Sequence, residues 1–380
     1  MTKKQKNMKL RISLLLIICA ICAISFIWQN QLETALNNFI NPPISTDVDS
    51  CELKVHFIYV GQGDSILIEL PDDKIMLIDS GPGDGEKLLV DYLNFVFQTR
   101  EDRVIDYFLI THQDEDHVGG ADKVFDNFDV ENFYRPNVYT QKEAEDLNIT
   151  NSKNICKTGV FGTMITKMEE EGCLTVNVVE GGSKMLLDES CGYEIEFITP
   201  LKESYSNAND YSPMTILTYK DRKFLFTGDA ETAVESELIA VDKVNDIDVD
   251  VLKVGHHGSN SSSGKDFLKA ISPEYAVICV GIDNTYKHPT ESTLENLKAE
   301  VGESNIYRTD IDGNIIVGVD KDEETHGKAS IKIATNGELH QIVNIKWWYV
   351  VVIVIGASFV ILILPAKKQK QIAKKIKAKK

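Results

Sequence analysis

The sequence predicts a mixed α/β domain in which helices cover β-sheets, placed between two apolar segments near the ends of the chain. Short β-branched runs recur along the middle of the chain, first close together and then alternating with helical spacing. Of the 380 residues, 26% are charged and 43% are hydrophobic. This composition is typical of a globular protein and excludes a disordered, collagenous or disulfide-scaffold chain.

Charge is distributed unevenly along the chain. The net charge is −18, yet residues 1–11 carry five Lys or Arg and residues 365–380 carry eight Lys, without Asp or Glu in either stretch. The middle therefore has 27 basic against 58 acidic residues, a net charge of −31. Such a surface repels polyanions, so a protein that coats nucleic acid through a broad basic face is disfavoured, and phosphate chemistry would need metal ions.

Two apolar segments are long enough to span a bilayer. Residues 12–28 contain no charge, exceed a usual signal-peptide core and lack a clear cleavage site, so we expect an uncleaved anchor. Residues 347–364 have Trp and Tyr at one end and lysines at the other, as transmembrane helices mark their interfaces. The positive-inside rule places both termini in the cytoplasm and residues 29–346 outside the cell membrane.

The resulting domain plan has six parts. It comprises a basic cytoplasmic end (1–11), a transmembrane helix or signal anchor (12–28), a linker (29–50), a globular α/β domain (51–340), a second transmembrane helix (347–364) and a lysine-rich cytoplasmic tail (365–380). Five of the seven cysteines lie between the spans, without a paired CxxC pattern. One disulfide among Cys156, Cys173 and Cys191 is compatible with the extracellular placement, but the sequence does not assign it.

Within the domain we expect strands and helices in an order typical of covered sheets. The predicted strands are 52–60, 64–70, 74–79, 104–110, 192–198, 214–219, 223–227, 249–254, 275–280 and 312–318, and the predicted helices are 85–97, 158–171, 230–240, 263–270 and 290–300. Residues 120–190 are more polar and loop-rich, and we interpret them as an insertion between two halves.

The sharpest chemical signal follows the predicted strand 104–110. His112, Asp114, Asp116 and His117 place two imidazoles and two carboxylates within six residues. Oxygen and imidazole ligands together suit Zn²⁺, Mn²⁺ or Fe²⁺ better than Ca²⁺. A solvated polar loop is the alternative, but it requires no such alternation, and further ligand types follow later strands: Thr227-Gly228-Asp229, Gly255-His256-His257-Gly258-Ser259 and His288-Pro289. Polar clusters at strand ends meet at one edge of a sheet.

Taken together, these residues resemble the metallo-β-lactamase fold hydrolases, and most of all the outer hydrolase domain of ComEC-type competence proteins. The motifs that carry the resemblance are Val60-Gly61-Gln62-Gly63-Asp64-Ser65, Leu77-Ile78-Asp79-Ser80-Gly81, the His112 to His117 cluster, Thr227-Gly228-Asp229, His256-His257-Gly258-Ser259 and His288-Pro289. The resemblance covers roughly residues 52–320. It implies a four-layer αββα sandwich with a site for two divalent ions, Zn²⁺ or Mn²⁺, between the sheets.

The resemblance also implies roles for individual residues. Asp116, His117 and one of His256 and His257 would hold one ion, His112 and Asp114 the other, and Asp229 would bridge them. Asp79 and Asp64 would lie behind the ligands and orient them. Asp114 departs from the pattern, since the family at large has His there. A His before Asp229 is also missing, with Asn209 and Asp210 as the nearest candidates, so we expect the His112/Asp114 site to be the weaker one. Competence proteins carry a polytopic channel and this chain has two spans, which excludes DNA import by this chain alone.

Three functions are compatible with the sequence. The first is metal-dependent hydrolysis of phosphodiesters, with DNA or another phosphodiester polymer as substrate. Asp114 or Asp229 would orient the nucleophile. His288, together with whichever of His256 and His257 is not a ligand, would donate a hydrogen bond to the phosphoryl oxygen or the leaving oxygen. The catalytic residues expected for this first function are Asp114, Asp229, His257 and His288. The second is a cell-envelope phosphoester hydrolase of the phosphorylcholine esterase kind, disfavoured because residues 51–340 contain no Trp to box a quaternary ammonium. The third is a non-catalytic, metal-stabilised module.

Overall fold

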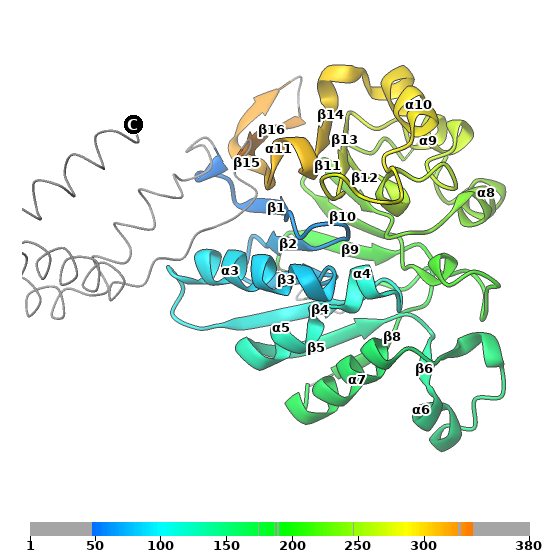
Figure 1. Cartoon of the computed structure of the whole chain (residues 1–380). Helices are drawn as coiled ribbons and strands as arrows, with labels where there is room; N and C mark the ends of the chain where they lie inside the picture. The colour runs from blue at the N-terminus through cyan, green and yellow to red at the C-terminus, as the bar shows by residue number, and fades with distance from the viewer. Residues whose placement is uncertain are drawn as a thin grey trace, which may run out of the picture. The chain divides into compact units, whose positions relative to one another are not determined.

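The domain contains two β-sheets packed face to face (Figure 1). A computed structural model describes residues 48–336 except 174, 186, 188–189, 246 and 326–327. Contacts divide the chain into two units, and these residues belong to the unit Ile44–Ile342. The predicted spans 12–28 and 347–364 lie outside the described residues. Among the helices that are described, none has the length and apolar character needed to cross a membrane.

The first sheet has eight strands in the order β16-β15-β1-β2-β3-β4-β5-β8. Their bounds are β1 Leu53–Phe57, β2 Ile66–Glu69, β3 Ile75–Ile78, β4 Val104–Leu109, β5 Asp129–Arg135, β8 Thr175–Val178, β15 Ile315–Thr325 and β16 Lys328–Thr335. The second has six in the order β14-β13-β12-β11-β10-β9. Its strands are β9 Tyr193–Phe197, β10 Thr215–Tyr219, β11 Arg222–Phe226, β12 Val251–Lys253, β13 Tyr275–Ile278 and β14 Ile306–Arg308. A small pair, β6 Tyr139–Thr140 and β7 Ile155–Cys156, stands apart from both sheets.

Helices cover the outer face of each sheet, which gives four layers (Figure 1). On the first sheet lie α3 Glu86–Phe97, α4 Glu115–Val118, α5 Ala121–Asn127 and α7 Gly159–Glu171, with α6 Gln141–Asp146 beside the small pair. On the second lie α8 Thr232–Ala240, α9 Lys265–Ile271 and α10 Glu291–Val301, and the short α11 Thr309–Asp312 precedes β15.

Alternating side chains explain the layering. In β3, Met76 and Ile78 enter the core between the sheets, whereas Ile75 and Leu77 pack under the helices. Because successive strand residues face opposite sides, a strand that is apolar on both faces requires a cover on both. The inter-sheet core is rich in aromatic residues, with Phe57 and Phe226 ring centroids 6.4 Å apart.

The strands and helices predicted outside 120–190 are confirmed, with shifts of a few residues at their ends. The interpretation of 120–190 as an insertion is wrong, because β5 and β8 extend the first sheet in parallel beside β4. These strands escaped prediction because polar residues interrupt them, as Asp129, Glu131 and Asn132 do in β5. The short strands β6 and β7, and β14 and β16 elsewhere, were also missed, whereas the helix predicted at 158–171 is confirmed as α7. Cys156, Cys173 and Cys191 are free, as are Cys51 and Cys279.

Candidate metal centre

The polar motifs converge because the strands before them run in the same direction. β3 and β4 are parallel neighbours, and so are β11, β12 and β13 in the other sheet. The carboxyl ends of parallel strands meet at one sheet edge. Asp79 follows β3, the His112 loop follows β4, Asp229 follows β11 and His256-His257 follow β12.

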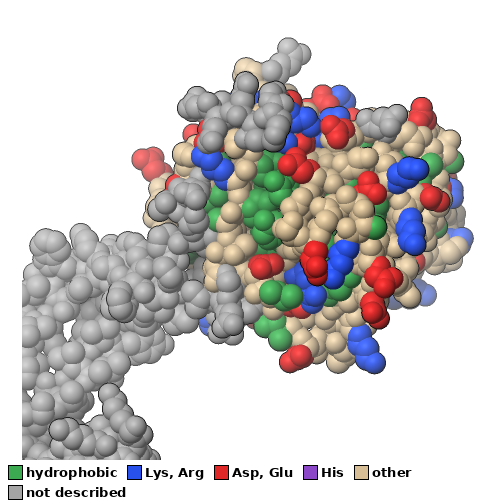
Figure 2. Space-filling view, turned by 90° about the horizontal axis from the view of Figure 1, so that it is seen from above, with side chains coloured by type: hydrophobic (Ala, Val, Ile, Leu, Met, Phe, Trp, Pro, Cys, Tyr) green, Lys and Arg blue, Asp and Glu red, His purple; other side chains and the backbone are tan. Residues whose placement is uncertain are grey.

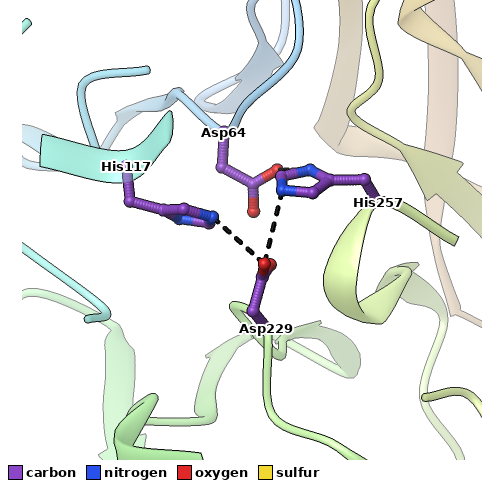
Figure 3. A group of neighbouring side chains, drawn as sticks. All are labelled: Asp64, His117, Asp229 and His257. Atoms are coloured by element: carbon purple, nitrogen blue, oxygen red, sulfur yellow. Dashed lines mark ion pairs between the residues drawn. The ribbon is translucent and has the colours of Figure 1, made fainter. Parts of the chain in front are cut away.

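Asp229 lies at the centre of this cluster, and four imidazoles surround one of its carboxylate oxygens. Its Oδ2 is 3.3 Å from Nε2 of His117 and 3.3 Å from Nε2 of His257 (Figure 3). The Nε2 atoms of His256 and His112 lie farther away, at 3.7 and 4.0 Å. Its other oxygen, Oδ1, is buried without a hydrogen-bond partner. This position fits the bridging role that the resemblance implies.

His117 is held in one orientation by Asp79. The Asp79 Oδ2 atom accepts a hydrogen bond from His117 Nδ1 at 2.7 Å, and both residues are buried. Asp79 is fixed in turn by the backbone N–H and the hydroxyl of Thr111, each donating at 2.7 Å. A protonated Nδ1 leaves the Nε2 lone pair of His117 directed at the cluster, which is how a carboxylate prepares an imidazole to bind a metal ion.

His257 is held in a similar way from the opposite sheet. Its Nδ1 donates to the backbone carbonyl of Cys279 at 3.0 Å and lies 3.1 Å from Asp64 Oδ1 (Figure 3). Asp64 is itself paired with the buried ammonium of Lys253, 2.5 Å from its Oδ2. Although Asp64 offers an oxygen within 4.8 Å of ligand atoms of His117, Asp229 and His257, its charge is already compensated by Lys253. We therefore assign it an orienting position behind His257.

Backbone conformation aims the two consecutive imidazoles. His256 and His257 have φ angles of 47° and 51°, in the left-handed region that non-glycine residues adopt rarely. Gly228, with φ 51°, precedes Asp229, and a Cβ there would lie 2.9 Å from Thr111 and Ser212 side-chain atoms. Strained backbone of this kind clusters at functional sites, where surrounding contacts hold it in place.

The grouping within the loop after β4 differs from the one that the resemblance implies. His112, Asp116 and His117 bring ligand atoms together, and Asp116 Oδ2 also lies 3.2 Å from His257 Nε2. Asp114 Oδ2 is 3.8 Å from His112 Nε2, with a side chain 46% exposed. Asp116 therefore lies between the two halves of the site, and Asp114 is the more peripheral carboxylate.

The remaining candidates lie around the edge of the cluster. His256 is 24% exposed, and its Nδ1 contacts Ser261, Asn209 and Glu231. His257 is the more buried of the two and has the shorter contact with Asp229. Asn209 therefore supports His256, while Asp210 accepts from the Glu231 backbone N–H and does not supply the missing ligand. His288 packs against His256, with ring centroids 5.6 Å apart.

Electrostatics distinguish the imidazoles. Burial would lower the pKa of His117, but the charges of Asp229 and Asp79 raise it well above its ordinary value. Burial lowers the pKa of His112 to about 3, with His117 adding to the shift. Burial, then the charges of His257 and His256, lower the pKa of His288 to about 4. His112 and His288 are thus neutral near pH 7.

The donor set fits divalent cations. Nε2 of both His112 and His117 and Oδ1 of Asp229 are buried without hydrogen-bond partners, an arrangement that is costly unless a ligand completes it. Asp64, Asp79, Asp114, Asp116 and Asp229 against Lys253 amount to four negative charges, which two divalent ions would balance. Buried charges of this density require counter-charges or metal coordination.

Sequence reasoning missed Lys253 and Thr111, which act behind the ligands. Lys253 is 1% exposed and also donates to the Gly228 carbonyl at 3.2 Å, so it ties β12 to both Asp64 and the Asp229 loop. The sequence does contain a sign of this role, because Lys253 stands alone inside the apolar run Val251-Leu252-Lys253-Val254. A Lys is rarely fully buried unless it is paired, so a Lys in a buried strand indicates an acidic partner.

A separate cavity of about 740 Å³ contains none of the cluster residues. Its walls come from Asn137 and Tyr139, the segment around residues 148–154, the end of β8 and residues 200–203. The metal-ligand candidates are thus not located in this cavity.

Comparison with known families agrees with this arrangement. Residues 58–158 and 195–282 match the model of the metallo-β-lactamase superfamily, and these stretches contain Asp64, Asp79, the His112 loop, Asp229 and His257. The chain carries a metallo-β-lactamase domain. Its predicted similarity to the hydrolase domain of ComEC-type competence proteins is confirmed by the relatives described next.

The metallo-β-lactamase domain is similar to parts of larger proteins. ComE operon protein 3 of Bacillus subtilis (strain 168) is 26% identical over 294 residues, covering 73% of this chain and 34% of that protein. Competence protein ComA of Neisseria gonorrhoeae is 37% identical over 128 residues, covering 34% of this chain and 18% of that protein. The chain thus spans about a third or less of these relatives. The crystal structure of the metallo-β-lactamase fold protein YhfI from Bacillus subtilis matches with a TM-score of 0.40 and 11% identity, covering 67% of this chain and 95% of that one.

Proposed function

We propose that this chain is a metal-dependent phosphodiesterase held at the cell membrane, which cleaves DNA or another phosphodiester polymer outside the cell. The observation that carries the proposal is the group of imidazoles around Asp229 Oδ2, at a site where five aspartates face a single lysine. The similarity to competence proteins supports phosphodiester polymers as the substrate class.

The proposed cofactors are two divalent ions, Zn²⁺ or Mn²⁺. His117 and His257 would hold one ion, His112 and Asp114 the other, and Asp116 and Asp229, which lie between the two halves, would be available to both. When bound, such ions polarise a phosphoryl oxygen and activate water for attack. Asp79 would keep Nδ1 of His117 protonated, and the Cys279 carbonyl with the nearby charge of Asp64 would do the same for His257, so that each Nε2 remains a ligand.

Two groups at the edge of the site are available for proton transfer. Burial, then the charge of Asp116, raise the pKa of Asp114, so this half-exposed carboxylate can accept a proton from the attacking water. The neutral His288 has a buried Nδ1 without a hydrogen-bond partner. It can donate to a phosphoryl or leaving oxygen that approaches from the side of His256.

The enzyme assay that tests this function uses the full-length chain in detergent, with Zn²⁺ or Mn²⁺ after removal of bound metal. We expect cleavage of a small diester such as methyl p-nitrophenyl phosphate and of single-stranded DNA, and no cleavage in excess chelator. Activity on a monoester or a β-lactam with no diester cleavage under any metal would contradict the proposal.

Salt dependence sharpens the same assay. Acidic and basic side chains are interspersed on the described part of the face in Figure 2, and residues 12–364 have a net charge of −31. We therefore expect a high KM for DNA, and DNA cleavage that is unchanged or improved by moderate salt, because salt screens repulsion with a Debye length of about 10 Å at 0.1 M. Steep inhibition by salt would reveal a basic DNA-binding track.

Membrane attachment through residues 12–28 and 347–364 is part of the proposal. Protease added to intact cells should digest the domain while tags at both termini stay protected. Cleavage of a terminal tag with the domain protected would show the opposite topology.

A further inference from the structure

We propose that Tyr286 forms a stacking platform for a nucleobase at the mouth of the metal centre, which makes it a specificity residue for nucleic acid over other diesters. This inference rests on the proposed phosphodiesterase function and names the part of the substrate that is bound beside the scissile phosphate. Tyr286 lies in the loop after β13, which also carries His288. Its side chain is 66% exposed, the largest fraction among the exposed large hydrophobic residues described.

The rings at this edge of the site form a series. Tyr286 and His288 have ring planes 26° apart with centroids separated by 5.8 Å. His288 and His257 have planes 25° apart with centroids separated by 6.5 Å. Both separations lie in the range of offset aromatic pairs. The series leads outward from a buried ligand candidate to Tyr286, which ends it with a face open to solvent, where a further planar ring can stack.

The loop is held firmly, although its tip is exposed. Asn284 Nδ2 donates to the carbonyls of Gly281 at 3.0 Å and His288 at 2.7 Å, and its Oδ1 accepts from the His288 N–H at 3.0 Å. The loop start is fixed by the Gly281 N–H, which donates to Gln62 Oε1 at 3.0 Å. A ring on such a loop stacks with less loss of conformational freedom than one on a mobile segment.

Charge around the platform favours ring contact over phosphate attraction. The loop carries Asp283 and Lys287, which have opposite charges, and Ile282, 47% exposed, adds apolar surface to it. Base stacking on aromatic side chains tolerates any sequence, because every base has a π-face. The chemical class that fits is therefore a single-stranded nucleic acid, unpaired beside the cleaved bond.

The experiment compares two single-stranded hexamers of equal charge, one of deoxythymidine and one of abasic tetrahydrofuran units, cleaved by the full-length protein with Mn²⁺ or Zn²⁺. We expect the wild type to cleave the thymidine hexamer with a kcat/KM about five- to tenfold higher than that for the abasic hexamer. This is the low end of the range for base stacking on an aromatic side chain, because one face of the stacked base stays open to water. Tyr286→Ala should abolish this preference, Tyr286→Phe should keep it, and moderate salt should leave the ratio unchanged.

The matched control is Val241→Ala, another exposed apolar residue at the opposite end of α8 from Asp229, and it should change nothing. Metal content and cleavage of the abasic hexamer, which has no base to stack, should be the same in wild type and Tyr286→Ala, which verifies that the variant folds with an intact metal centre. Equal cleavage of both hexamers by wild type, or a preference that survives in Tyr286→Ala, overturns this inference and leaves the hydrolase intact. Failure to cleave any diester instead overturns the proposed function itself.

Discussion

The two halves of the candidate metal centre are prepared to different degrees. On the His117–His257 side, each imidazole has its Nδ1 occupied by a carboxylate or carbonyl, and both side chains are at most 2% exposed. On the His112–Asp114 side, His112 Nδ1 meets only the Thr111 hydroxyl at 3.1 Å, and Asp114 is half-exposed. The first side is therefore fixed before an ion arrives, whereas the second depends more on what binds there.

Asp229 is shared by both halves, so its removal should have the largest effect. In Asp229→Asn we expect loss of bound metal from both sides and at least a hundredfold lower activity, because an amide supplies no charge to balance the cations. Metal content by mass spectrometry and diester turnover measure this. Asp242→Asn, an exposed residue beyond the end of α8, is the matched control. Full metal occupancy in Asp229→Asn would remove Asp229 from the ligand set.

Withdrawal of metal tests whether the buried carboxylates need counter-charges. With free ion at 100 times its dissociation constant, one bound ion stabilises the folded state by about 2.7 kcal/mol. We expect chelator to lower the unfolding midpoint of the wild type in thermal melts, and to have little effect on Asp229→Asn. An unchanged midpoint in the wild type would show that the cluster compensates its own charges without ions.

Most of the metal-ligand candidates could be predicted from the sequence, because they stand in short motifs directly after recognisable strands. His112 to His117, Asp229 and His256-His257 were found in this way. The supporting shell was harder to predict. Lys253 pairs with Asp64 across 189 positions of sequence, and a contact of that kind depends on how the two sheets pack. Asp116 lies between both halves because α4 starts immediately after Asp114, which turns the two carboxylates in different directions.

β5 shows the same limit at the level of the fold. Its neighbours β4 and β8 cover its edges, and the buried residues Val130, Phe133 and Tyr134 alternate imperfectly with Glu131 and Asn132. The polar residues of this segment predict a loop when the sequence is considered alone. The segment forms a strand because it pairs with β4. Propensity in strands reflects the neighbours that a segment meets, which the sequence alone does not display.

Asp79 tests whether preparation of the first side matters for binding. Asp79→Asn keeps the size of the side chain but removes the charge behind His117, and we expect a 10- to 100-fold loss in metal affinity on that side. Competition titration against a chromogenic chelator measures this affinity. The backbone of Thr111 retains a partner through the amide oxygen, so the unfolding midpoint of the metal-free protein should change little. Unaltered affinity would mean that His117 needs no carboxylate to orient it.

The smallest expected effect comes from strengthening the less prepared side. Asp114 occupies the N-cap position of α4, yet its side chain makes no capping hydrogen bond, so Asp114→His removes no cap. The family at large has His at this position, and imidazole suits Zn²⁺ better than Mn²⁺, for which carboxylate is the better ligand. We expect about tenfold tighter Zn²⁺ binding at the His112 side, weaker Mn²⁺ binding there, and no change for the first ion at the His117–His257 side. Stepwise calorimetric titration separates the two ions. If the affinity for the first ion changes as much as the affinity for the second, then the two halves form one coupled site. The different support of the imidazoles on the two sides would then not determine how tightly each ion binds.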